Sequence, residues 1–338
     1  MHYNRILLVI VLLLSFPVSY SCTRILYVTA NNDVIVGNNM DWHESMPTKL
    51  LCYPRELSRN GQVPNHTLQW KSKYGSVVSI AYNKIATNGM NENGFAAHVL
   101  SFPESNYGLR DEKVYGLSIA MWVQFYLDNF STVEEAVHYS QQNQFQIVTD
   151  KDPITNKTIG LHLAIEDASG DSAIIEYING EARIYHNKHY LVVTNGPSYN
   201  KAMEMSKEYT GLGGQKPLPG TTQSFSRFIR ALFYVNHLPK TMSTNKAIFD
   251  LLSVLDNVSQ PAGTISTGRV TDTTTVWKSI ADLSHLTYYF RSSDDFNTIW
   301  ISLNKLNFLP GSPILSLDLS RHDLIGDMTQ SLTSNVIQ

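Results

Sequence analysis

Short apolar runs separated by turn-forming residues recur along the chain and predict β-hairpins. The runs that predict strands cover residues 24–28, 34–37, 77–82, 95–102, 161–166, 172–177, 183–185, 190–194, 273–280, 287–291 and 298–303. The clusters 31–33, 88–94 and 167–171 are rich in Asn, Asp and Gly, as turns between paired strands are. Because consecutive hairpins build antiparallel sheets, most of the chain is predicted to be antiparallel β-structure.

Three segments between and after these hairpins predict helices. Residues 115–129 are apolar with few charges and predict a buried helix, and a capping box at 131–134 opens a second one. Residues 224–235 predict a third helix, with Arg227 on its first turn. The stretch 43–75 is polar and is predicted to be irregular. Helices inserted between hairpins favour an α+β fold in which helical layers lie outside the sheets.

The first 21 residues have the three-part pattern of a secretory signal peptide. Arg5 supplies a positive charge, and Ile6 to Phe16 is apolar except for one serine. Small residues, Ser19 and Ser21, stand at the −3 and −1 positions before Cys22. The apolar run is shorter than the roughly 20 residues that span a bilayer. We therefore expect residues 1–21 to be removed and residues 22–338 to form a single exported domain, periplasmic or secreted.

Cleavage after Ser21 would make Cys22 the new N-terminus, and three interpretations of this residue compete. It could be a catalytic nucleophile, because a terminal cysteine carries a thiol and a basic α-amine on one residue. It could be a lipoprotein anchor, although Ser19 stands where such signals usually have Leu. It could also form a disulfide with Cys52, the other cysteine in the chain, as exported proteins often do.

Composition narrows the class of protein. Hydrophobic residues make up 43% and charged residues 16% of the chain, which is typical of a globular protein rather than a disordered one. The net charge of −3 and the absence of a dense basic patch argue against a nucleic-acid partner. No second apolar run reaches membrane length, so we expect no stable membrane insertion once the signal is removed. The 11% aromatic content suggests a well-built core or an aromatic-lined pocket.

Taken in order, six motifs resemble the choloylglycine hydrolase family, whose members include bile salt hydrolases and penicillin V acylases. The motifs are Cys22-Thr23-Arg24-Ile25, Gly37-Asn38-Asn39-Met40-Asp41-Trp42, Asn91-Glu92-Asn93-Gly94-Phe95, Asp167-Ala168-Ser169-Gly170-Asp171-Ser172, Val193-Thr194-Asn195-Gly196-Pro197, and Leu218-Pro219-Gly220 followed by Ser226-Arg227-Phe228. The resemblance spans nearly all of the chain after residue 21. It implies an N-terminal-nucleophile hydrolase, with an αββα sandwich of two antiparallel sheets between helical layers. It implies hydrolysis of linear amides with neither metal nor cofactor.

The resemblance also implies roles for individual residues. Cys22 would attack the amide carbonyl, and Asp41 would hold the nucleophile and its amine. Asn195 and the backbone N–H of Ser101 would bind the oxyanion, and Arg227 would place positive charge near the thiol. Without the resemblance, Asp41 and Asn195 would be interpreted as turn residues and Arg227 as a solvated charge.

The sequence departs from the family pattern at three places. Asn38 stands where the family normally has Arg, which would remove one cationic contact to the nucleophile. Ser101 stands where bile salt hydrolases carry Asn and penicillin V acylases carry Tyr, so substrate preference does not carry over. The short segment between Asn195 and Pro219 lacks the insertion that assembles tetramers in many members, although a homo-oligomer remains possible.

The leading hypothesis is therefore an exported amidase whose substrate has an apolar acyl or steroid part. Conjugated bile salts, penicillin V and N-acyl homoserine lactones are the family's substrates. The alternative is a weakly active or inactive member that acts as a lipid-anchored binding protein through Cys22. Because the mechanism needs a free Cys22, Cys52 is predicted to be a reduced, buried thiol.

Overall fold

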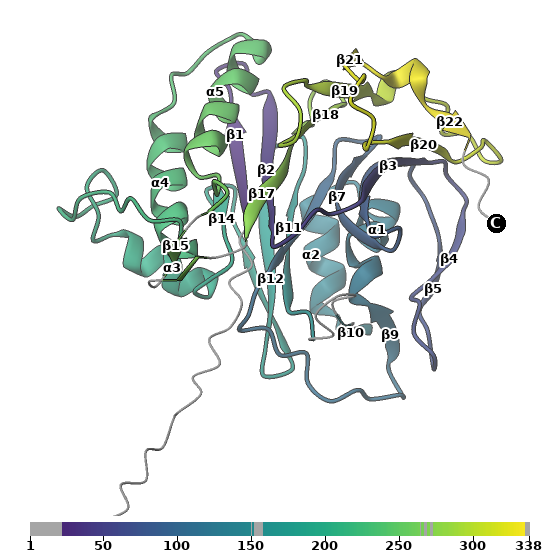
Figure 1. The fold of residues 1–338 in the computed structure, drawn as a ribbon. Coiled ribbons are helices and arrows are strands. Elements are labelled where there is room, and N and C mark those ends of the chain that lie inside the picture. Colours follow the sequence, from purple (N-terminus) through teal and green to yellow (C-terminus); the bar gives the residue numbers. More distant parts are fainter. Residues whose placement is uncertain are drawn as a thin grey trace, which may run out of the picture.

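Two large sheets stacked face to face form the centre of the protein, and helices cover their outer faces (Figure 1). This computed structural model describes residues 22–334 except 150, 152–157, 264, 267–268 and 271–272. The four layers are helix, sheet, sheet and helix, so the predicted α+β sandwich of two antiparallel sheets between helical layers is confirmed. The signal peptide predicted for residues 1–21 lies outside the described residues.

The first sheet has seven strands in the order β14-β1-β2-β17-β18-β19-β21. Their bounds are Val192–Val193 for β14, Thr23–Val28 for β1, Val34–Trp42 for β2, Thr274–Asp282 for β17, Thr287–Ser292 for β18, Ile299–Ser302 for β19 and Gly326–Asp327 for β21. Neighbours are antiparallel except β19 and β21. The strand β1 therefore lies between β14 and β2, and these three strands bring distant parts of the sequence together.

The second sheet has nine strands, all antiparallel to their neighbours, in the order β13-β12-β11-β8-β7-β6-β3-β20-β22. Their bounds are Glu181–His186 for β13, Ser172–Ile178 for β12, Leu161–Glu166 for β11, Ala96–Ser101 for β8, Ile85–Asn91 for β7, Ser76–Ala81 for β6, Thr48–Tyr53 for β3, Leu315–Asp318 for β20 and Thr333–Ser334 for β22. Three two-stranded pairs complete the β-structure: β4 (Ser58–Asn60) with β5 (Gln69–Lys71), β9 (Tyr115–Ser118) with β10 (Phe145–Val148), and β15 (Ile265–Ser266) with β16 (Arg269–Val270).

The described part of the chain has five α-helices, which are divided between the two outer faces. They are α1 (Trp122–Asn129), α2 (Val133–Gln141), α3 (Tyr199–Ser206), α4 (Ser224–His237) and α5 (Thr244–Asn257), with 3₁₀ turns at Ile119–Met121, Leu303–Lys305 and Thr329–Ser331. The helices α4 and α5 pack on β1 and β2 of the first sheet, and α1 packs on β7 and β8 of the second. Strands covered on both faces are buried along their whole length, as β1 and β2 nearly are.

The burial explains why the apolar pattern of these strands is continuous rather than alternating. One apolar cluster fills the space between the sheets and continues under α4 and α5. A second cluster lies between the nine-stranded sheet and α1 and α2. Because β1 and β2 are buried on both faces, most polar side chains on these two strands are expected to find partners inside the protein.

Several boundaries predicted from the sequence are wrong. Residues 43–75 are not irregular, because β3 is a central strand of the second sheet and lies between Pro47 and Pro54. The turn predicted at 88–94 begins too early, since β7 continues to Asn91. The strand at 34–37 continues to Trp42.

The predicted helices also differ from the structure in detail. The helix expected from residue 115 begins only at Trp122, because Tyr115–Ser118 pairs with β10 as a strand. The cap of α2 is shifted by one residue, with Thr132 accepting the N–H of Glu135. The helices α3 and α5 were not predicted, although Ser243 caps α5 through the N–H of Lys246.

Candidate active site

Cys22 directly precedes β1 and lies beside β2. It is 3% exposed, and its Sγ lies 3.7 Å from the Met40 sulfur and 3.9 Å from the Asp41 carbonyl oxygen. Thr23 pairs with Asn39 in the strand register, so Cys22 stands next to the end of β2. The predicted proximity of the cysteine and the aspartate thus follows from the first hairpin.

Arg227 reaches this point from the first turns of α4 and is fully buried. Its Nη1 donates to the Cys22 carbonyl oxygen at 2.7 Å and to the Thr23 hydroxyl at 2.5 Å. Its Nη2 donates to Asn195 Oδ1 at 2.8 Å. Burial lowers the pKa of Arg227, while the nearby Asp41 and Cys22 act in the opposite direction. The guanidinium is therefore not the solvated charge that its place at a helix start alone would indicate.

Asn195 follows β14 and connects both sheets at the thiol. Its Oδ1 accepts hydrogen bonds from the Cys22 backbone N at 2.5 Å and from Arg227. Its Nδ2 donates to the Ser101 carbonyl oxygen at 2.7 Å, at the end of β8. An amide NH₂ has two hydrogens, so one remains for a further acceptor. Arg227 fixes which end of the amide faces the cysteine, because its guanidinium can only donate.

Asp41 lies on β2 with its carboxylate fully buried. Its Oδ1 accepts a hydrogen bond from the Thr275 hydroxyl at 2.5 Å, and its Oδ2 lies 3.8 Å from Arg227 Nη1 without a hydrogen bond. Burial raises the pKa of Asp41 to about 6, although Arg227 and Thr275 act to lower it. Thr275 was not predicted from the sequence. It is the cross-strand partner of Asp41 on β17, and no motif marked it.

Burial also has the largest effect on the pKa of the Cys22 thiol. It raises the pKa of Cys22 to about 11, and the Asp41 carboxylate adds to this effect. Hydrogen bonding from the backbone of Asp41 and Ser101 and the charge of Arg227 act to lower it. In the uncut chain the nitrogen of Cys22 is a peptide amide without basicity. The thiol is therefore protonated at neutral pH as long as residues precede it.

An apolar cavity of about 50 Å³ opens onto Cys22 between the two sheets. Its lining residues are Cys22, Met40, Trp42, Met46, Ala81, Tyr82, Ile85, Thr87, Val99, Ser101, Ile119, Ile159 and Leu161. Trp42 Nε1 donates to the Tyr82 hydroxyl at 2.7 Å, and that hydroxyl donates to Glu44 at 2.6 Å. This chain of hydrogen bonds fixes the indole in the cavity wall. Sequence analysis missed the wall, although Trp42 belongs to one of the six motifs.

Most of the predicted site residues meet at this point. Those that the structure brings together are Cys22, Asp41, Ser101, Asn195 and Arg227. Asn38 is different: it is buried on β2 and does not line the cavity, and neither polar atom of its side chain has a hydrogen-bond partner. The structure gives Asn38 no contact with the substrate cavity.

The structure also bears on the second cysteine, on metal binding and on membrane-spanning helices. Cys52 is a free, buried thiol on β3, as predicted, and Cys22 is also free. Across the residues that the structure describes, no group of three or more His, Cys, Asp or Glu side chains could hold a metal ion. Within the same residues, the helices are all too short or too polar to cross a membrane.

Comparison with known proteins agrees with this geometry. Residues 22–325 match the family of linear amide C–N hydrolases known as the choloylglycine hydrolase family. The penicillin V acylase of Pectobacterium atrosepticum is 38% identical over 336 residues, covering 92% of this chain and 88% of that protein. A bile salt hydrolase/transferase of Clostridium perfringens is 25% identical over 324 residues, covering 87% of this chain and 95% of that protein.

Solved structures give the same result at the level of the fold. Penicillin V acylase from Agrobacterium tumefaciens superposes with a TM-score of 0.84 at 39% identity, covering 93% of this chain and 98% of that one. A conjugated bile acid hydrolase from Clostridium perfringens superposes with a TM-score of 0.75 at 21% identity, covering 94% of this chain and all of that one. The chain belongs to the choloylglycine hydrolase family and is a hydrolase of linear amide C–N bonds.

Proposed function

We propose that this hydrolase is an exported N-terminal-cysteine amidase that becomes active when cleavage after Ser21 frees the α-amine of Cys22. One observation carries the proposal. The thiol of Cys22 faces an apolar cavity, while its own backbone nitrogen is held by Asn195 on the other side. Cleavage would turn that nitrogen from an amide into an amine without moving the thiol. Export rests on the signal-peptide pattern of residues 1–21.

The free amine supplies what the uncut chain lacks. An α-amine has an unperturbed pKa of about 7.7–8 and can accept the thiol proton near neutral pH. The resulting thiolate attacks the carbonyl carbon of the amide, and the carbonyl oxygen becomes an oxyanion. The ammonium then returns its proton to the departing nitrogen as the C–N bond breaks. Water hydrolyses the remaining thioester and releases the acid and the thiol.

Two donors near the thiol support the assignment of an oxyanion site. The backbone N–H of Ser101 is close enough to act on the thiol, and Asn195 Nδ2 has one hydrogen that Ser101 does not use. A preorganised donor of this kind typically contributes a factor of about 10²–10³ in rate. Arg227 holds the Asn195 amide in the orientation that presents Nδ2 to the substrate.

The carboxylate of Asp41 has a matching role toward the amine. Its Oδ2 has no hydrogen-bond donor in the uncut chain, and the carboxylate charge acts on the Cys22 thiol and raises the thiol pKa. An α-ammonium brings two further N–H groups and a positive charge to this place. We assign Asp41 to hold the ammonium during the proton transfers.

The cavity selects the acyl part of the substrate. It is lined by methionine, aromatic and aliphatic side chains and measures about 50 Å³, well below the roughly 300–1,000 Å³ of sites that enclose a drug-sized ligand. A narrow aryl or linear acyl group fits this space better than a steroid does. The preferred substrate is therefore of the penicillin V or N-acyl homoserine lactone type, and conjugated bile salts should be poorer substrates.

Three purified proteins test the proposal: the chain beginning at Cys22, the same chain with one alanine fixed before Cys22, and a Cys22→Ser chain beginning at residue 22. Each is assayed for release of primary amine from penicillin V, an N-acyl homoserine lactone and glycocholate. Only the first should hydrolyse amides, and the alanine extension should lower kcat by about 10²–10⁴ because it removes the general base.

Thiol titration under denaturing conditions provides the control, since the extended protein must still have both free thiols. Full activity in the extended protein would rule out the role of the α-amine. Glycocholate cleaved faster than penicillin V would contradict the assignment of a narrow acyl group. Inactivity of the first protein toward all three substrates would contradict the amidase itself.

A further inference from the structure

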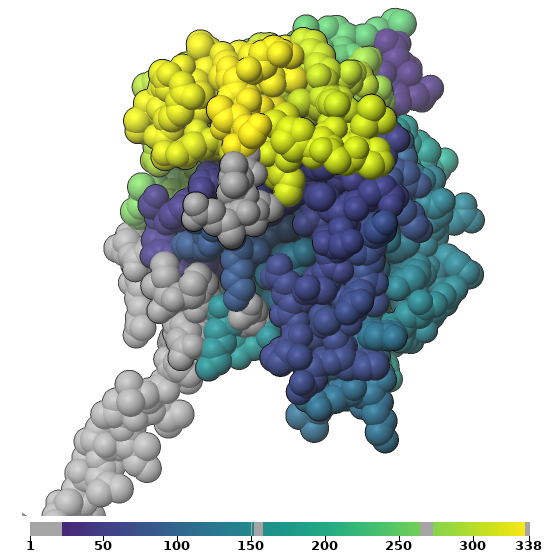
Figure 2. Space-filling view, turned by 90° about the vertical axis from the view of Figure 1, so that its right-hand side faces the viewer, coloured from purple at the N-terminus to yellow at the C-terminus, as the bar shows by residue number. Residues whose placement is uncertain are grey.

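A second and larger cavity opens on the side of the molecule below the C-terminal segments, which form the yellow cap in Figure 2. Its volume is about 420 Å³. The segment 45–49, the strands β17 to β19 and the segment 318–324 form its walls. Cys22 is not among its lining residues, and Met46 is the lining residue that it shares with the catalytic cavity. We call it the C-terminal cleft. Amide hydrolysis as proposed above does not use it.

The bottom of the C-terminal cleft is apolar and aromatic. Trp277 and Phe290 lie side by side on β17 and β18, with ring centroids 5.2 Å apart and planes tilted by 37°. Ile299 and Leu324 complete this floor. At the mouth, Phe296 is 98% exposed, between two residues that line the cleft. Both features favour a ligand with an apolar body, because burial of apolar surface drives binding.

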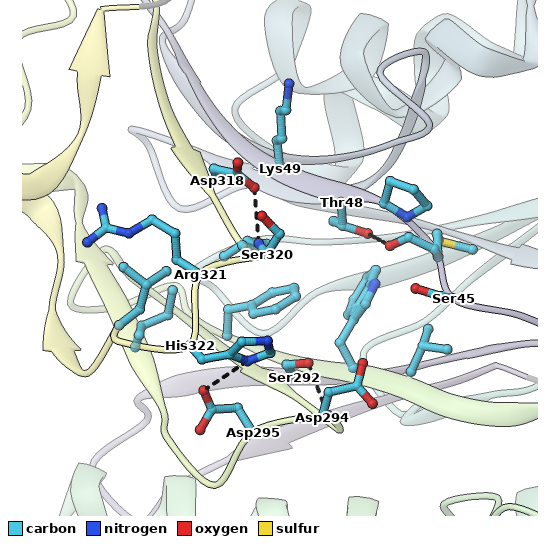
Figure 3. Close-up of a pocket in the computed structure, with 18 of the residues that line it drawn as sticks. Ser45, Thr48, Lys49, Ser292, Asp294, Asp295, Asp318, Ser320, Arg321 and His322 are labelled. Carbon is cyan, nitrogen blue, oxygen red and sulfur yellow. Dashed lines mark hydrogen bonds and ion pairs between the residues drawn. The ribbon is translucent and has the colours of Figure 1, made fainter.

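Charged side chains line the rim, and Figure 3 shows them on facing walls. Lys49, Asp318 and Ser320 lie on one wall, and Ser292, Asp294 and Asp295 lie on the other, where His322 reaches Asp295 from the C-terminal segment. The positive charge of Lys49 faces Asp318, which lies next to it across the β3–β20 pair. Arg321 is bound through two hydrogen bonds to Asp323. Each of these cations therefore has a carboxylate near it.

The opposite wall carries two carboxylates that are weakly compensated by positive charge. Asp294 makes no ion pair with any residue that the structure describes. Asp295 accepts the N–H of Asn297 at 3.0 Å, and the nearest cationic group is His322, whose Nδ1 is 3.9 Å away. These two carboxylates leave the rim with a net negative charge beside an aromatic floor. Carboxylates and aromatic rings together are the chemistry that recognises organic ammonium ions.

We propose that the C-terminal cleft is a second binding site, for a small organic cation with an aromatic or aliphatic body and one ammonium group. The apolar body lies over Trp277 and Phe290, and the ammonium lies between Asp294 and Asp295. The volume of about 420 Å³ is within the range of roughly 300–1,000 Å³ found for small-molecule sites.

Tryptamine is a suitable probe because it combines an aromatic ring with one ammonium group. Isothermal titration calorimetry on the purified protein should show saturable binding of one tryptamine per chain. The double variant Asp294→Asn with Asp295→Asn should weaken binding by about tenfold, since each partly exposed pair contributes about 0.5–1 kcal/mol. Indole-3-propionate, with a carboxylate in place of the ammonium, should bind at least about tenfold more weakly than tryptamine.

The control is a second pair of adjacent acids outside the cleft. Asp111→Asn with Glu112→Gln changes the net charge by the same amount, in the exposed loop before β9, and should leave tryptamine binding unchanged. Equal weakening in both double variants would mean that only the overall charge matters, and would overturn the proposal. So would equal binding of the amine and the acid, or no saturable binding at millimolar tryptamine.

Discussion

Two completely buried arginines lie near Cys22, and their charges are compensated in different ways. Arg24 on β1 has a carboxylate in direct contact, with its Nε 2.7 Å from Glu166, and its remaining donors bind carbonyl and hydroxyl oxygens. Arg227 on α4 has its carboxylate, Asp41, only at 3.8 Å. Its close partners are neutral oxygen atoms, among them the Cys22 carbonyl and the Asn195 amide.

We interpret this difference in partners to mean that the charge of Arg24 stabilises the fold, whereas the charge of Arg227 acts on the active site. In a buried ion pair in close contact, the carboxylate largely cancels the positive potential that the arginine would exert on other groups. An arginine surrounded by neutral acceptors projects positive potential onto the groups that these acceptors hold. Here those groups are the Cys22 thiol and the proposed oxyanion site. Burial acts to lower the pKa of Arg227, whereas Arg24 is paired within contact distance. The predictions below test this distinction.

The largest expected effect is on stability, from Arg24. Arg24→Met leaves the buried Glu166 carboxylate with His98, at 3.2 Å, as its remaining basic neighbour, and breaking a buried pair typically costs about 3–5 kcal/mol in the free energy of unfolding. Urea unfolding monitored by circular dichroism measures this. The double variant Arg24→Met with Glu166→Gln should recover most of the loss. An equally unstable double variant would show that packing of the arginine stem, not its charge, is what matters.

Arg227→Lys should show the reverse, with a large loss of activity and a small loss of stability. Lysine keeps the charge but cannot bind Cys22, Thr23 and Asn195 at once, because it lacks the planar fork of donors. We expect kcat/KM for penicillin V to fall by about 10²-fold, close to the effect of losing one oxyanion donor. If Arg227→Lys instead unfolds like Arg24→Met while retaining activity, the two arginines have the same role and the comparison fails.

The sequence predicted which residues meet at Cys22 but not how Arg227 differs from Arg24. The motifs and their order identified Asp41, Asn195 and Arg227 through resemblance, and the first hairpin placed Asp41 beside Cys22. Nothing local indicated that Arg227 is buried, because its partners come from elements up to about 200 positions away. Thr275 was missed for the same reason, since only the pairing of β2 with β17 brings it to Asp41. The periodicity of apolar residues predicts individual strands, but it does not predict which distant strands pair or in which register.

Prediction of the fold was limited in the same way, because long-range pairing could not be predicted from the sequence. Hairpins that are local in sequence were located well, and so was the layered α+β arrangement. The strand β3 was missed because it is short and stands between prolines, and its partners β6 and β20 lie on either side through long connections. The helix α5 was missed although it has a serine cap and an apolar face that packs on β2.

A third prediction uses the raised pKa of Asp41, about 6, which follows mainly from burial. The ionised carboxylate is the form that holds the α-ammonium, so activity is lost as pH falls through about 6. The α-amine must also be neutral to take the thiol proton. The slope of log kcat/KM against pH should therefore increase from one to two below about pH 6, and return to one in Asp41→Asn.

Stability should respond to pH in the opposite direction. A carboxyl group whose pKa is raised in the folded state stabilises the protein fully only below its unfolded pKa of about 3.9, and this contribution is lost as pH rises through about 6. Asp41→Asn should thus be less active but more resistant to urea at pH 7 than the parent protein. Lower stability of Asp41→Asn at pH 7 would mean that Asp41 and Arg227 form as close a pair as Glu166 and Arg24.

The smallest expected effect concerns Asn38, which lies on β2 between Arg24 of β1 and Ser279 of β17. On β2 it is the cross-strand neighbour of Arg24, and it lies on the same strand as Asp41. The Arg24 guanidinium is engaged by Glu166 and by carbonyl groups on the far side of β1, so it does not replace the arginine that family members normally carry at position 38. Both polar atoms of the Asn38 side chain are buried without partners.

Asn38→Leu keeps nearly the same volume and removes two unsatisfied polar atoms. A buried unsatisfied group costs about 1–3 kcal/mol, so the variant should be more stable by about 1 kcal/mol in urea unfolding. Because Asn38 does not line the catalytic cavity, kcat/KM should stay within about twofold, a change of about 0.4 kcal/mol in the barrier. Asn38→Ala serves as the control, since it removes the same polar atoms but leaves a void that offsets the gain. A tenfold loss of kcat/KM in Asn38→Leu, with the fold intact, would show that Asn38 contributes to catalysis and contradict this prediction.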